Sequence, residues 1–346
     1  MNIGYVFHPS SLLHDTGADH PESAGRLEAV MTHLNSIGLL DRLIKIEPRR
    51  ATRDELSLVH TSEYQKQVAS LCAAGGGSLD ADTFLSPGSC KAAEYAAGGA
   101  VAAVEAVMDG VVGKCFALVR PPGHHASADR GSGFCIYNNA AIAVRVARAK
   151  FNLTRIAIID FDVHHGNGTQ SIFDDDPDTM YVSCHQSPYY PGSGSVEDIG
   201  TGAGSGTKVN IPLPPGCGDA EYIRVYDEIV MPVIRRFNPE LMLVSAGYDA
   251  HRDDPLAGMK LTTSGYAEIV KRISNVAAEC CGGRAVFCLE GGYNLVALAR
   301  CVAANFNILL GESASAEIAA EPVEYSFGSP DISGLIADLK KVYRLS

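Results

Sequence analysis

The sequence has few basic residues relative to acidic ones. Its 28 lysines and arginines face 40 aspartates and glutamates, which gives a formal net charge of −12. This balance argues against non-specific binding to nucleic acid or to an anionic membrane. It is compatible with cationic substrates, although an acidic balance is also common in proteins that bind none.

The sequence also lacks long apolar runs, and no run approaches the roughly 18 residues of a membrane span. The start of the chain has neither the charged segment nor the long apolar stretch of a signal peptide. The ten cysteines form no CxxC pair, and the adjacent Cys280 and Cys281 are poorly placed for a disulfide or a zinc knuckle. We therefore expect a cytoplasmic protein whose cysteines are reduced and mostly buried.

Short apolar runs typical of strands alternate with stretches of helical periodicity. The predicted strands are residues 3–7, 115–119, 155–159, 180–183, 208–211, 241–245 and 285–289. The predicted helices are 23–37, 92–108, 138–149, 219–237, 264–279 and 296–310, with a last helix near 332–343. This alternation predicts an α/β fold, in which helices flank both faces of a mainly parallel central sheet. Short linkers and the absence of internal repeats favour a single domain over residues 1–346.

The apolar run 156–159 leads directly into Asp160, Asp162, His164 and His165. Parallel sheets place their chemistry at the carboxyl ends of strands, and strand alternation directs Asp162 and His164 to the same side. A carboxylate and an imidazole so placed are a start for a zinc or other transition-metal site. Taken alone, the motif fits a capping aspartate with surface histidines equally well.

Four strand-like runs are followed by loops rich in reactive side chains, and in a parallel sheet these loops would meet at one edge. The loop after 241–245 contains Asp249, which is the best candidate for a third metal ligand, although it could also be an ordinary turn residue. His251 in the same loop has no advantage in spacing. Together with Asp162 and His164, Asp249 would leave an open position for water.

Two further loops offer acid–base and hydrogen-bonding groups. His124 and His125 follow a Pro-Pro-Gly turn and, as neighbours, disfavour double protonation. Asp160 and Asn167 are candidates for orienting them, while a structural histidine pair is the alternative. Tyr293 follows two glycines, and its phenol could donate a hydrogen bond to a developing oxyanion. By itself, an aromatic residue after Gly-Gly is more often structural.

Taken together, these motifs resemble the zinc-dependent histone deacetylase superfamily, in its class II-like bacterial branch, which includes acetylpolyamine amidohydrolases. The matching segments occur in family order over roughly residues 3 to 310. They are His-Pro-Glu at 20–22 with Arg26, Arg-Pro-Pro-Gly-His-His at 120–125, Gly-Phe-Cys-Ile-Tyr-Asn-Asn at 133–139, Asp-Phe-Asp-Val-His-His-Gly-Asn-Gly-Thr-Gln at 160–170, Ser-Ala-Gly-Tyr-Asp-Ala at 245–250 and Glu-Gly-Gly-Tyr-Asn at 290–294.

The resemblance implies the open arginase–deacetylase fold and one catalytic zinc ion on Asp162, His164 and Asp249. It pairs His124 with Asp160 and His125 with Asn167, where an Asn is typical of class II members, and it assigns Tyr293 to the substrate carbonyl. His165 has no implied role, and we expect it to pack behind the site. One or two structural potassium ions are also implied. The residues expected to hold potassium are Asp160, Asp162, His164, Ser183 and Cys184.

The resemblance further implies a channel for the acylated side chain. Gly133 and Phe134 form one wall, Tyr190 stands on the opposite wall where many relatives have Phe, and Asp82 is the rim carboxylate, with Asp80 close by. Leu256 occupies the position at which eukaryotic polyamine-preferring relatives carry Glu, and it offers no charge to a distal ammonium group. We therefore expect acetyl-lysine in a peptide or protein as substrate, and an acetylated polyamine or other small amine as the alternative.

The implied reaction is hydrolysis of the acetamide by a metal-activated water, which yields acetate and a free amine. A binuclear manganese hydrolase of the same fold is disfavoured because Gly166 stands where a bridging carboxylate is needed. A catalytically dead acetyl-lysine reader is disfavoured because every catalytic role is filled. The glycine-rich stretch 200–206 lacks GxGxxG spacing, so nucleotide binding is a weak interpretation.

Overall fold

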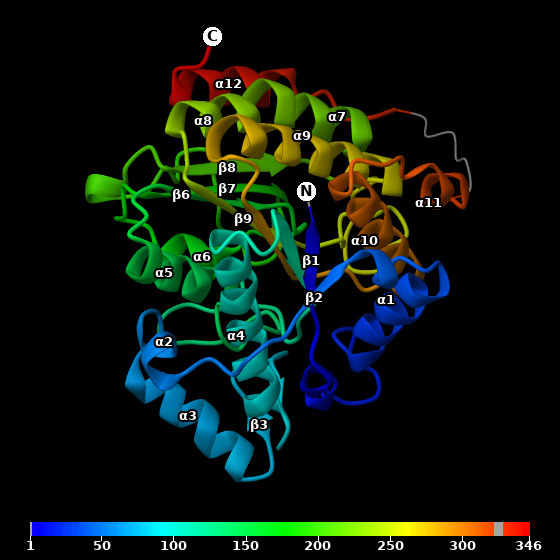
Figure 1. Cartoon of the computed structure of the whole chain (residues 1–346). Helices are drawn as coiled ribbons and strands as arrows, with labels where there is room; N and C mark the ends of the chain where they lie inside the picture. Colours follow the sequence, from blue (N-terminus) through cyan, green and yellow to red (C-terminus); the bar gives the residue numbers. More distant parts are fainter. Residues whose placement is uncertain (1, 322–327) are drawn as a thin grey trace.

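A computed structural model describes residues 2–321 and 328–346 of the chain, and the predicted domain and polar C-terminal tail therefore lie partly outside the described residues. Its centre is an eight-stranded sheet in the order β2-β1-β5-β10-β9-β6-β7-β8 (Figure 1). All neighbouring strands pair in parallel. The strands of the sheet are β1 (Ile3–Val6), β2 (Ile44–Ile46), β5 (Lys114–Ala117), β6 (Ile156–Asp160), β7 (Thr179–Gln186), β8 (Lys208–Leu213), β9 (Leu241–Ala246) and β10 (Ala285–Leu289).

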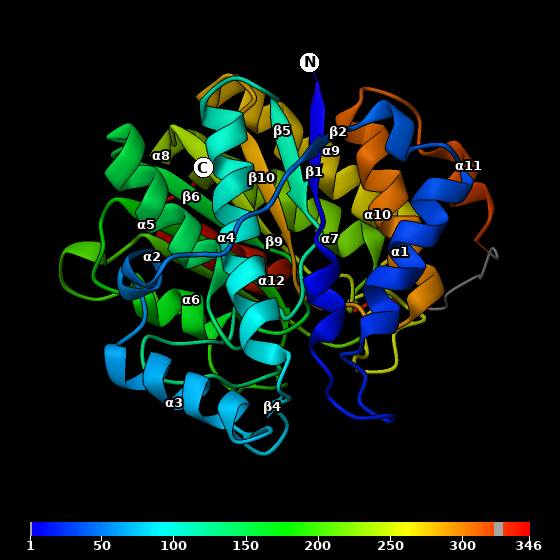
Figure 2. The same cartoon turned by 60° about the horizontal axis from the view of Figure 1, so that its bottom comes forward.

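Helices cover both faces of the sheet, as the sequence predicts (Figures 1 and 2). Strand β6 shows why: Ile156 and Ile158 pack into one apolar cluster together with α4 and α5, whereas Ala157 and Ile159 pack into another together with α9 and α10. A strand that is apolar on both faces must be covered on both. The main helices are α1 (Ala24–Ser36), α3 (Ser62–Ala73), α4 (Ser89–Met108), α5 (Asn139–Phe151), α7 (Asp219–Val225), α8 (Met231–Phe237), α9 (Thr263–Cys281), α10 (Leu295–Leu309) and α12 (Ser333–Tyr343).

The structure adds several short elements that the sequence pattern does not reveal, because each has too few residues to display a period. They are α2 (Arg53–Ser57), α6 (Asn167–Ile172), α11 (Ser315–Ala319), the edge strand β2, and a small antiparallel pair, β3 (Gly77–Ser78) with β4 (Phe84–Leu85). The predicted helix 219–237 is helical throughout but contains a π-helical turn at Tyr226–Val230. Pro232 follows this turn, and its missing N–H accounts for the local change in hydrogen bonding.

The order of the strands explains how the reactive loops are brought together. The four loops follow β5, β10, β9 and β6, which are consecutive neighbours in the sheet. Because these strands are parallel, their carboxyl ends lie along the same edge. None of the helices in the described residues is long and apolar enough to cross a membrane.

Candidate active site

The predicted metal ligands converge at the carboxyl ends of β6 and β9. One ligand atom each from Asp162, His164 and Asp249 lies within 4.8 Å of the others. The Nδ1 atom of His164 is 3.0 Å from Asp162 Oδ1 and 3.2 Å from Asp249 Oδ2. His251, the other residue considered for this role, points elsewhere, and its Nε2 lies 2.5 Å from Glu321 Oε1.

The chemistry of this group suits a zinc ion. Both carboxylates are buried, and each places one oxygen on a backbone donor: Gly291 N donates to Asp162 Oδ2 at 2.8 Å, and Val163 N donates to Asp249 Oδ1 at 2.8 Å. The other oxygen of each carboxylate faces the imidazole of His164. Burial and the neighbouring Asp162 raise the pKa of Asp249 to about 7. Two buried carboxylates beside one imidazole favour a cation, and this O,O,N donor set fits zinc.

Glycines allow the backbone to approach the two carboxylates closely. A Cβ on Gly291 would lie 2.1 Å from Asp249 Oδ2 and 2.6 Å from Asp162 Oδ2, and a Cβ on Gly247 would lie 2.1 Å from Asp162 Oδ2. Any side chain at either position would push a ligand out of place. The glycines in these two loops are therefore part of the site.

The two consecutive histidines lie beside this group, and each is held by the partner that the sequence suggests. His124 Nδ1 is 3.0 Å from Asp160 Oδ2, and His125 Nδ1 is 2.8 Å from Asn167 Oδ1. Their rings lie next to each other, tilted by 44°, at a centroid distance of 4.0 Å. Asp160 also accepts a hydrogen bond from the hydroxyl of Tyr181 at 2.9 Å.

The surroundings separate the pKa values of the two imidazoles. Burial lowers the pKa of His124, but the carboxylates of Asp162 and Asp160 outweigh burial and raise this pKa to about 10. Burial holds the pKa of His125 well below its usual range, and the charges of His124 and His164 lower it further. One imidazole therefore favours the charged form and the other the neutral form, as expected for coupled neighbours.

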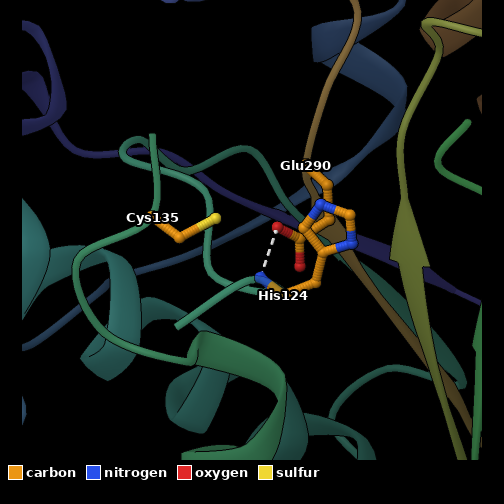
Figure 3. A group of neighbouring side chains, drawn as sticks. All are labelled: His124, Cys135 and Glu290. Atoms are coloured by element: carbon orange, nitrogen blue, oxygen red, sulfur yellow. Dashed lines mark hydrogen bonds between the residues drawn. The ribbon is translucent and has the colours of Figure 1, made fainter. Parts of the chain in front are cut away.

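The structure also reveals supports behind the histidine pair that sequence reasoning missed. Glu290 Oε2 accepts hydrogen bonds from Gly123 N at 2.7 Å and from His124 N at 3.2 Å, and Figure 3 shows the second of these. Glu290 is fully buried and its pKa is raised to about 7 by burial. Cys135 lies close to both side chains (Figure 3). In the sequence, the position of Glu290 directly after a predicted strand and before two glycines was the signal that could have indicated this supporting role.

Tyr293 is positioned by Arg26 and Asp254. Asp254 Oδ2 accepts a hydrogen bond from Tyr293 N at 2.6 Å. The guanidinium of Arg26 lies 4.9 Å from the centre of the Tyr293 ring and donates to the carbonyls of Gly292 at 2.7 Å and Glu290 at 2.5 Å. Arg26 lies in a motif singled out from the sequence and Asp254 in the loop after 241–245, but their contacts could not be read there.

A cavity of about 200 Å³ leads from the surface to this group. Its lining includes all five residues predicted for the substrate channel, together with Tyr189, which sequence reasoning missed. The lining residues are Asp82, His125, Gly133, Phe134, His164, Tyr189, Tyr190, Leu256 and Tyr293.

Hydrogen bonds and ring contacts near the cavity show that the neighbouring residues Asp80 and Asp82 differ in role, and they define the role of Tyr189. Asp80 Oδ1 accepts from the backbone of Asp82 and Thr83, at 3.2 and 2.8 Å, so Asp80 holds the turn while Asp82 faces the cavity. Tyr189 stacks on His164 with ring centroids 5.4 Å apart, and its hydroxyl donates to the carbonyl oxygen of Leu256. Tyr189 thus joins the two loops on that side of the channel.

The residues expected to hold potassium lie next to the site. Asp160 Oδ1 accepts from Asp162 N at 3.1 Å, and Ser183 is the register partner of Asp160 on β7. Ser183 Oγ lies 2.9 Å from His185 Nδ1. His165 is buried, with Nδ1 2.8 Å from Ser193 Oγ and Nε2 2.9 Å from Gln170 Oε1, so it links α6 to the loop after β7.

Comparison with known proteins identifies the family. The family model described as the histone deacetylase domain matches residues 20–309. This chain belongs to the histone deacetylase family. The expected resemblance and the α/β arginase–deacetylase fold are therefore confirmed.

Several relatives support this assignment along most of their length. A probable deacetylase of Archaeoglobus fulgidus is 44% identical over 297 residues, which cover 85% of this chain and 82% of the relative. The histone deacetylase-like amidohydrolase of Pseudomonas aeruginosa is 39% identical, covering 84% of this chain and 75% of the relative. The histone deacetylase 14, chloroplastic, of Arabidopsis thaliana is 40% identical, with 94% and 81% covered.

A solved structure extends the similarity to three dimensions. The crystal structure of the HDA15 HD domain superposes with a TM-score of 0.89 at 34% identity, and the match covers 99% of this chain and 94% of that one. The present histone deacetylase family member is therefore a hydrolytic deacetylase, and the family is generally zinc-dependent.

Proposed function

We propose that the chain is a zinc-dependent deacetylase that hydrolyses the acetamide of N-acetyl-lysine in a peptide or protein to acetate and a free amine. The observation that carries this proposal is the convergence of three groups on one cavity. A buried O,O,N ligand set, a histidine pair and a phenol-bearing loop all meet at its inner end.

Asp162, His164 and Asp249 would hold the zinc ion. When bound, the ion supplies Lewis acidity, which polarises the substrate carbonyl and lowers the pKa of a water molecule. The chain supplies the fixed positions of the ligands through Gly291 N and Val163 N. Such supporting hydrogen bonds orient ligands and contribute to metal affinity.

The histidine pair would carry the proton. The amide oxygen of Asn167 is an acceptor, so His125 carries its proton on Nδ1 and leaves the Nε2 lone pair free. With its lowered pKa, neutral His125 accepts a proton from the attacking water and then delivers it to the departing amine nitrogen. His124, whose charged form Asp160 stabilises, adds positive charge beside the developing oxyanion.

Tyr293 would donate a hydrogen bond from its phenol to the substrate oxygen. Burial keeps the pKa of this phenol well above its usual range, so the proton stays on the oxygen and is available for donation. Arg26 and Asp254 fix the loop from two sides. A donor held in place before the reaction stabilises developing charge with little reorganisation.

The lining of the channel favours a lysine side chain. Phe134 and Tyr190 supply aromatic walls for an aliphatic chain, and Asp82 at the opening supplies a carboxylate for the substrate backbone. Leu256 offers no charge to the distal ammonium group of a polyamine. A structural potassium ion at Asp160, Asp162, His164, Ser183 and Cys184 belongs to the same proposal.

The test is a panel of acyl substrates with the metal content measured on the same sample. We expect about one zinc ion per chain, loss of activity after chelation, recovery on adding zinc, and faster hydrolysis of acetyl-lysine peptides than of acetylputrescine or acetylspermidine. Much faster hydrolysis of the acetylpolyamines would overturn the substrate assignment. Full activity without metal would overturn the mechanism.

A further inference from the structure

A second cavity, of about 680 Å³, lies between α9, α10 and α11. These three helices pack against one another on one side of the molecule (Figure 1). The described residues that line this cavity include none of those that line the substrate channel, and none of them is aromatic. Its apolar lining is aliphatic and includes Ala267, Ile308, Leu309, Leu310, Ala314 and Ile318.

Lys114, the first residue of β5, lines this cavity from the sheet. Strand alternation places its side chain on the same face as Phe116, whose ring centre lies 5.5 Å from that of Phe306 on α10. Only 8% of Lys114 is exposed, and no described residue forms a hydrogen bond or an ion pair with its ammonium group. Burial lowers the pKa of Lys114. A buried cation without a partner is costly, and an anion in the cavity would remove that cost.

The other lysine that is buried among the described residues shows how this fold satisfies an ammonium group internally. Lys208 has no exposed surface. Its Nζ donates hydrogen bonds to the carbonyl oxygens of Asp176 at 3.2 Å and Thr179 at 3.0 Å, and to Thr207 Oγ1 at 2.5 Å. Lys114 has no such set of acceptors, although it also belongs to a strand inside the sheet. Its ammonium group is therefore available to a ligand.

The remaining charged side chains of the cavity lining have partners within the protein. Lys271 Nζ lies 3.3 Å from Glu268 Oε1, and Arg272 Nη1 lies 2.7 Å from Glu268 Oε2. Glu312 pairs with Arg42. The lysine of β5 is therefore the one charge in the described lining without a counter-charge. The cavity accordingly needs one negative charge rather than several.

We infer that this cavity binds an aliphatic monocarboxylate, with the carboxylate on Lys114 Nζ and the alkyl chain along the apolar lining. One ammonium group matches one carboxylate in a charge-assisted hydrogen bond. The aliphatic lining removes an alkyl chain from water, whereas a nucleobase would need an aromatic stacking partner. The volume lies within the range of small-molecule sites, roughly 300–1,000 Å³.

This site goes beyond the proposed function and is separate from the catalytic loops. Lys114 begins its strand, and the catalytic loops follow the ends of the strands, so the two sites involve opposite edges of the parallel sheet. Binding at Lys114 therefore requires neither the metal ligands nor a substrate.

The first experiment titrates the purified full chain, with its zinc, by isothermal calorimetry, using octanoate as the probe. We expect saturable binding of octanoate. Acetate lacks the alkyl chain, octanol lacks the charge and octylammonium has the opposite charge, so each should bind at least tenfold more weakly. Equal affinity for octanoate and any of these three compounds would overturn the assigned ligand chemistry.

Chemical labelling of the wild-type protein locates the bound probe. Octanoate should slow the reaction of Lys114 with an amine-reactive ester at least tenfold, as measured by peptide mass spectrometry. The exposed Lys66 on α3 is the internal control, and its rate should not change. Octanoate that leaves Lys114 unprotected binds elsewhere and overturns the inference. A Lys114 that does not react even without octanoate is closed to the cavity and overturns it equally.

A pair of variants tests the charge itself. Lys114→Met keeps a long side chain without the ammonium group, and it should weaken octanoate binding at least tenfold. Lys66→Met removes an exposed lysine outside the cavity and should bind octanoate like the wild type. Equal affinity in the two variants would contradict the role of Lys114. Because labelling needs no variant and no substrate, a failure here leaves the proposed deacetylase function intact, and an inactive enzyme leaves this test intact.

Discussion

At the scale of single residues, the site depends on groups whose donors and acceptors are fixed before a substrate arrives. His125 is held by an amide oxygen that can only accept, which decides which of its nitrogens carries the proton. Asp254 accepts a hydrogen bond from the backbone of Tyr293, and the guanidinium of Arg26 lies above its ring. These contacts fix the side chain and leave its hydroxyl available to the substrate. The proposed roles therefore follow from contacts as well as from residue type.

Replacement of Tyr293 by Phe should lower kcat by roughly 10²- to 10³-fold, the usual cost of removing one oxyanion donor. Zinc content and thermal stability should stay close to those of the wild type, because Tyr293 supplies no metal ligand. Steady-state kinetics with metal analysis checks this, and Tyr95→Phe, a residue outside the cavity lining, is the control. Retained full activity would remove Tyr293 from the mechanism.

Replacement of Leu256 by Glu should shift preference towards acetylated polyamines. A carboxylate at this half-buried position in the channel lining would attract a distal ammonium group. We expect the ratio of kcat/KM for acetylspermidine to kcat/KM for an acetyl-lysine peptide to rise on the order of tenfold, equivalent to about 1.4 kcal/mol. Leu256→Gln introduces a polar side chain of similar size without the negative charge. An equal rise in the kcat/KM ratio in that variant would contradict the electrostatic explanation.

At the scale of elements, the loops after β9 and β10 place their backbone in close contact with the metal ligands. A Cβ at Gly291 would lie only 2.1 Å from Asp249 Oδ2. The backbone N–H of Gly291 also donates a hydrogen bond to Asp162. The glycines are therefore explained by the approach of these two loops, which belong to adjacent strands.

Replacement of Gly291 by Ala should weaken zinc affinity by about 10- to 100-fold, the range seen when supports of a metal ligand are disturbed. Activity at limiting zinc should fall accordingly and recover in part at higher zinc concentration. Competition with a fluorescent chelator measures the affinity. Gly334→Ala in α12, where a Cβ meets nothing within 4 Å, is the matched control and should bind zinc normally. Equal affinity in the two variants would show that the loop has room to adjust.

At the scale of the whole molecule, buried ionisable groups other than the predicted metal ligands couple folding to pH. Glu22 is fully buried between Arg120 and Arg26. Burial favours its neutral form, but the charge of Arg120 outweighs burial and lowers the pKa of Glu22 to about 2. Burial also lowers the pKa of His60 to about 4. The Glu22 carboxylate ties the N-terminal part of the chain to the loop after β5.

The free energy of unfolding should fall in two ranges as the pH decreases. The folded protein excludes a proton from His60 that the unfolded chain takes up below about 6.5, so this contribution declines between pH 6.5 and about 4. At roughly 1.4 kcal/mol per pKa unit, it is on the order of 3 kcal/mol. The contribution of ionised Glu22 is present above about 4.5 and is lost as the pH falls towards 2.

Urea unfolding at a series of pH values measures how the free energy of unfolding changes with pH. His60→Gln keeps an acceptor for Asn138 N but does not ionise. The slope of its free energy of unfolding against pH between pH 6.5 and 4 should therefore be smaller than that of the wild type. An unchanged slope would contradict the assignment. Glu22→Gln should destabilise the protein at pH 7 by roughly 3–5 kcal/mol, because it leaves buried guanidinium groups without their counter-charge.

The sequence by itself determined the fold class, because the apolar runs of the parallel strands are long enough to read and alternate with helices. It also indicated Asp162, His164, the histidine pair and Tyr293, since each follows such a run. Only the tertiary structure decided that Asp82 rather than Asp80 faces the channel, that His251 points away from Asp249, and that Glu290, Tyr189 and Arg26 support the site. The physical reason is that periodicity is a local property of the chain. Contacts such as Arg26 to Gly292 or Cys90 to Val68 depend on how separate elements pack.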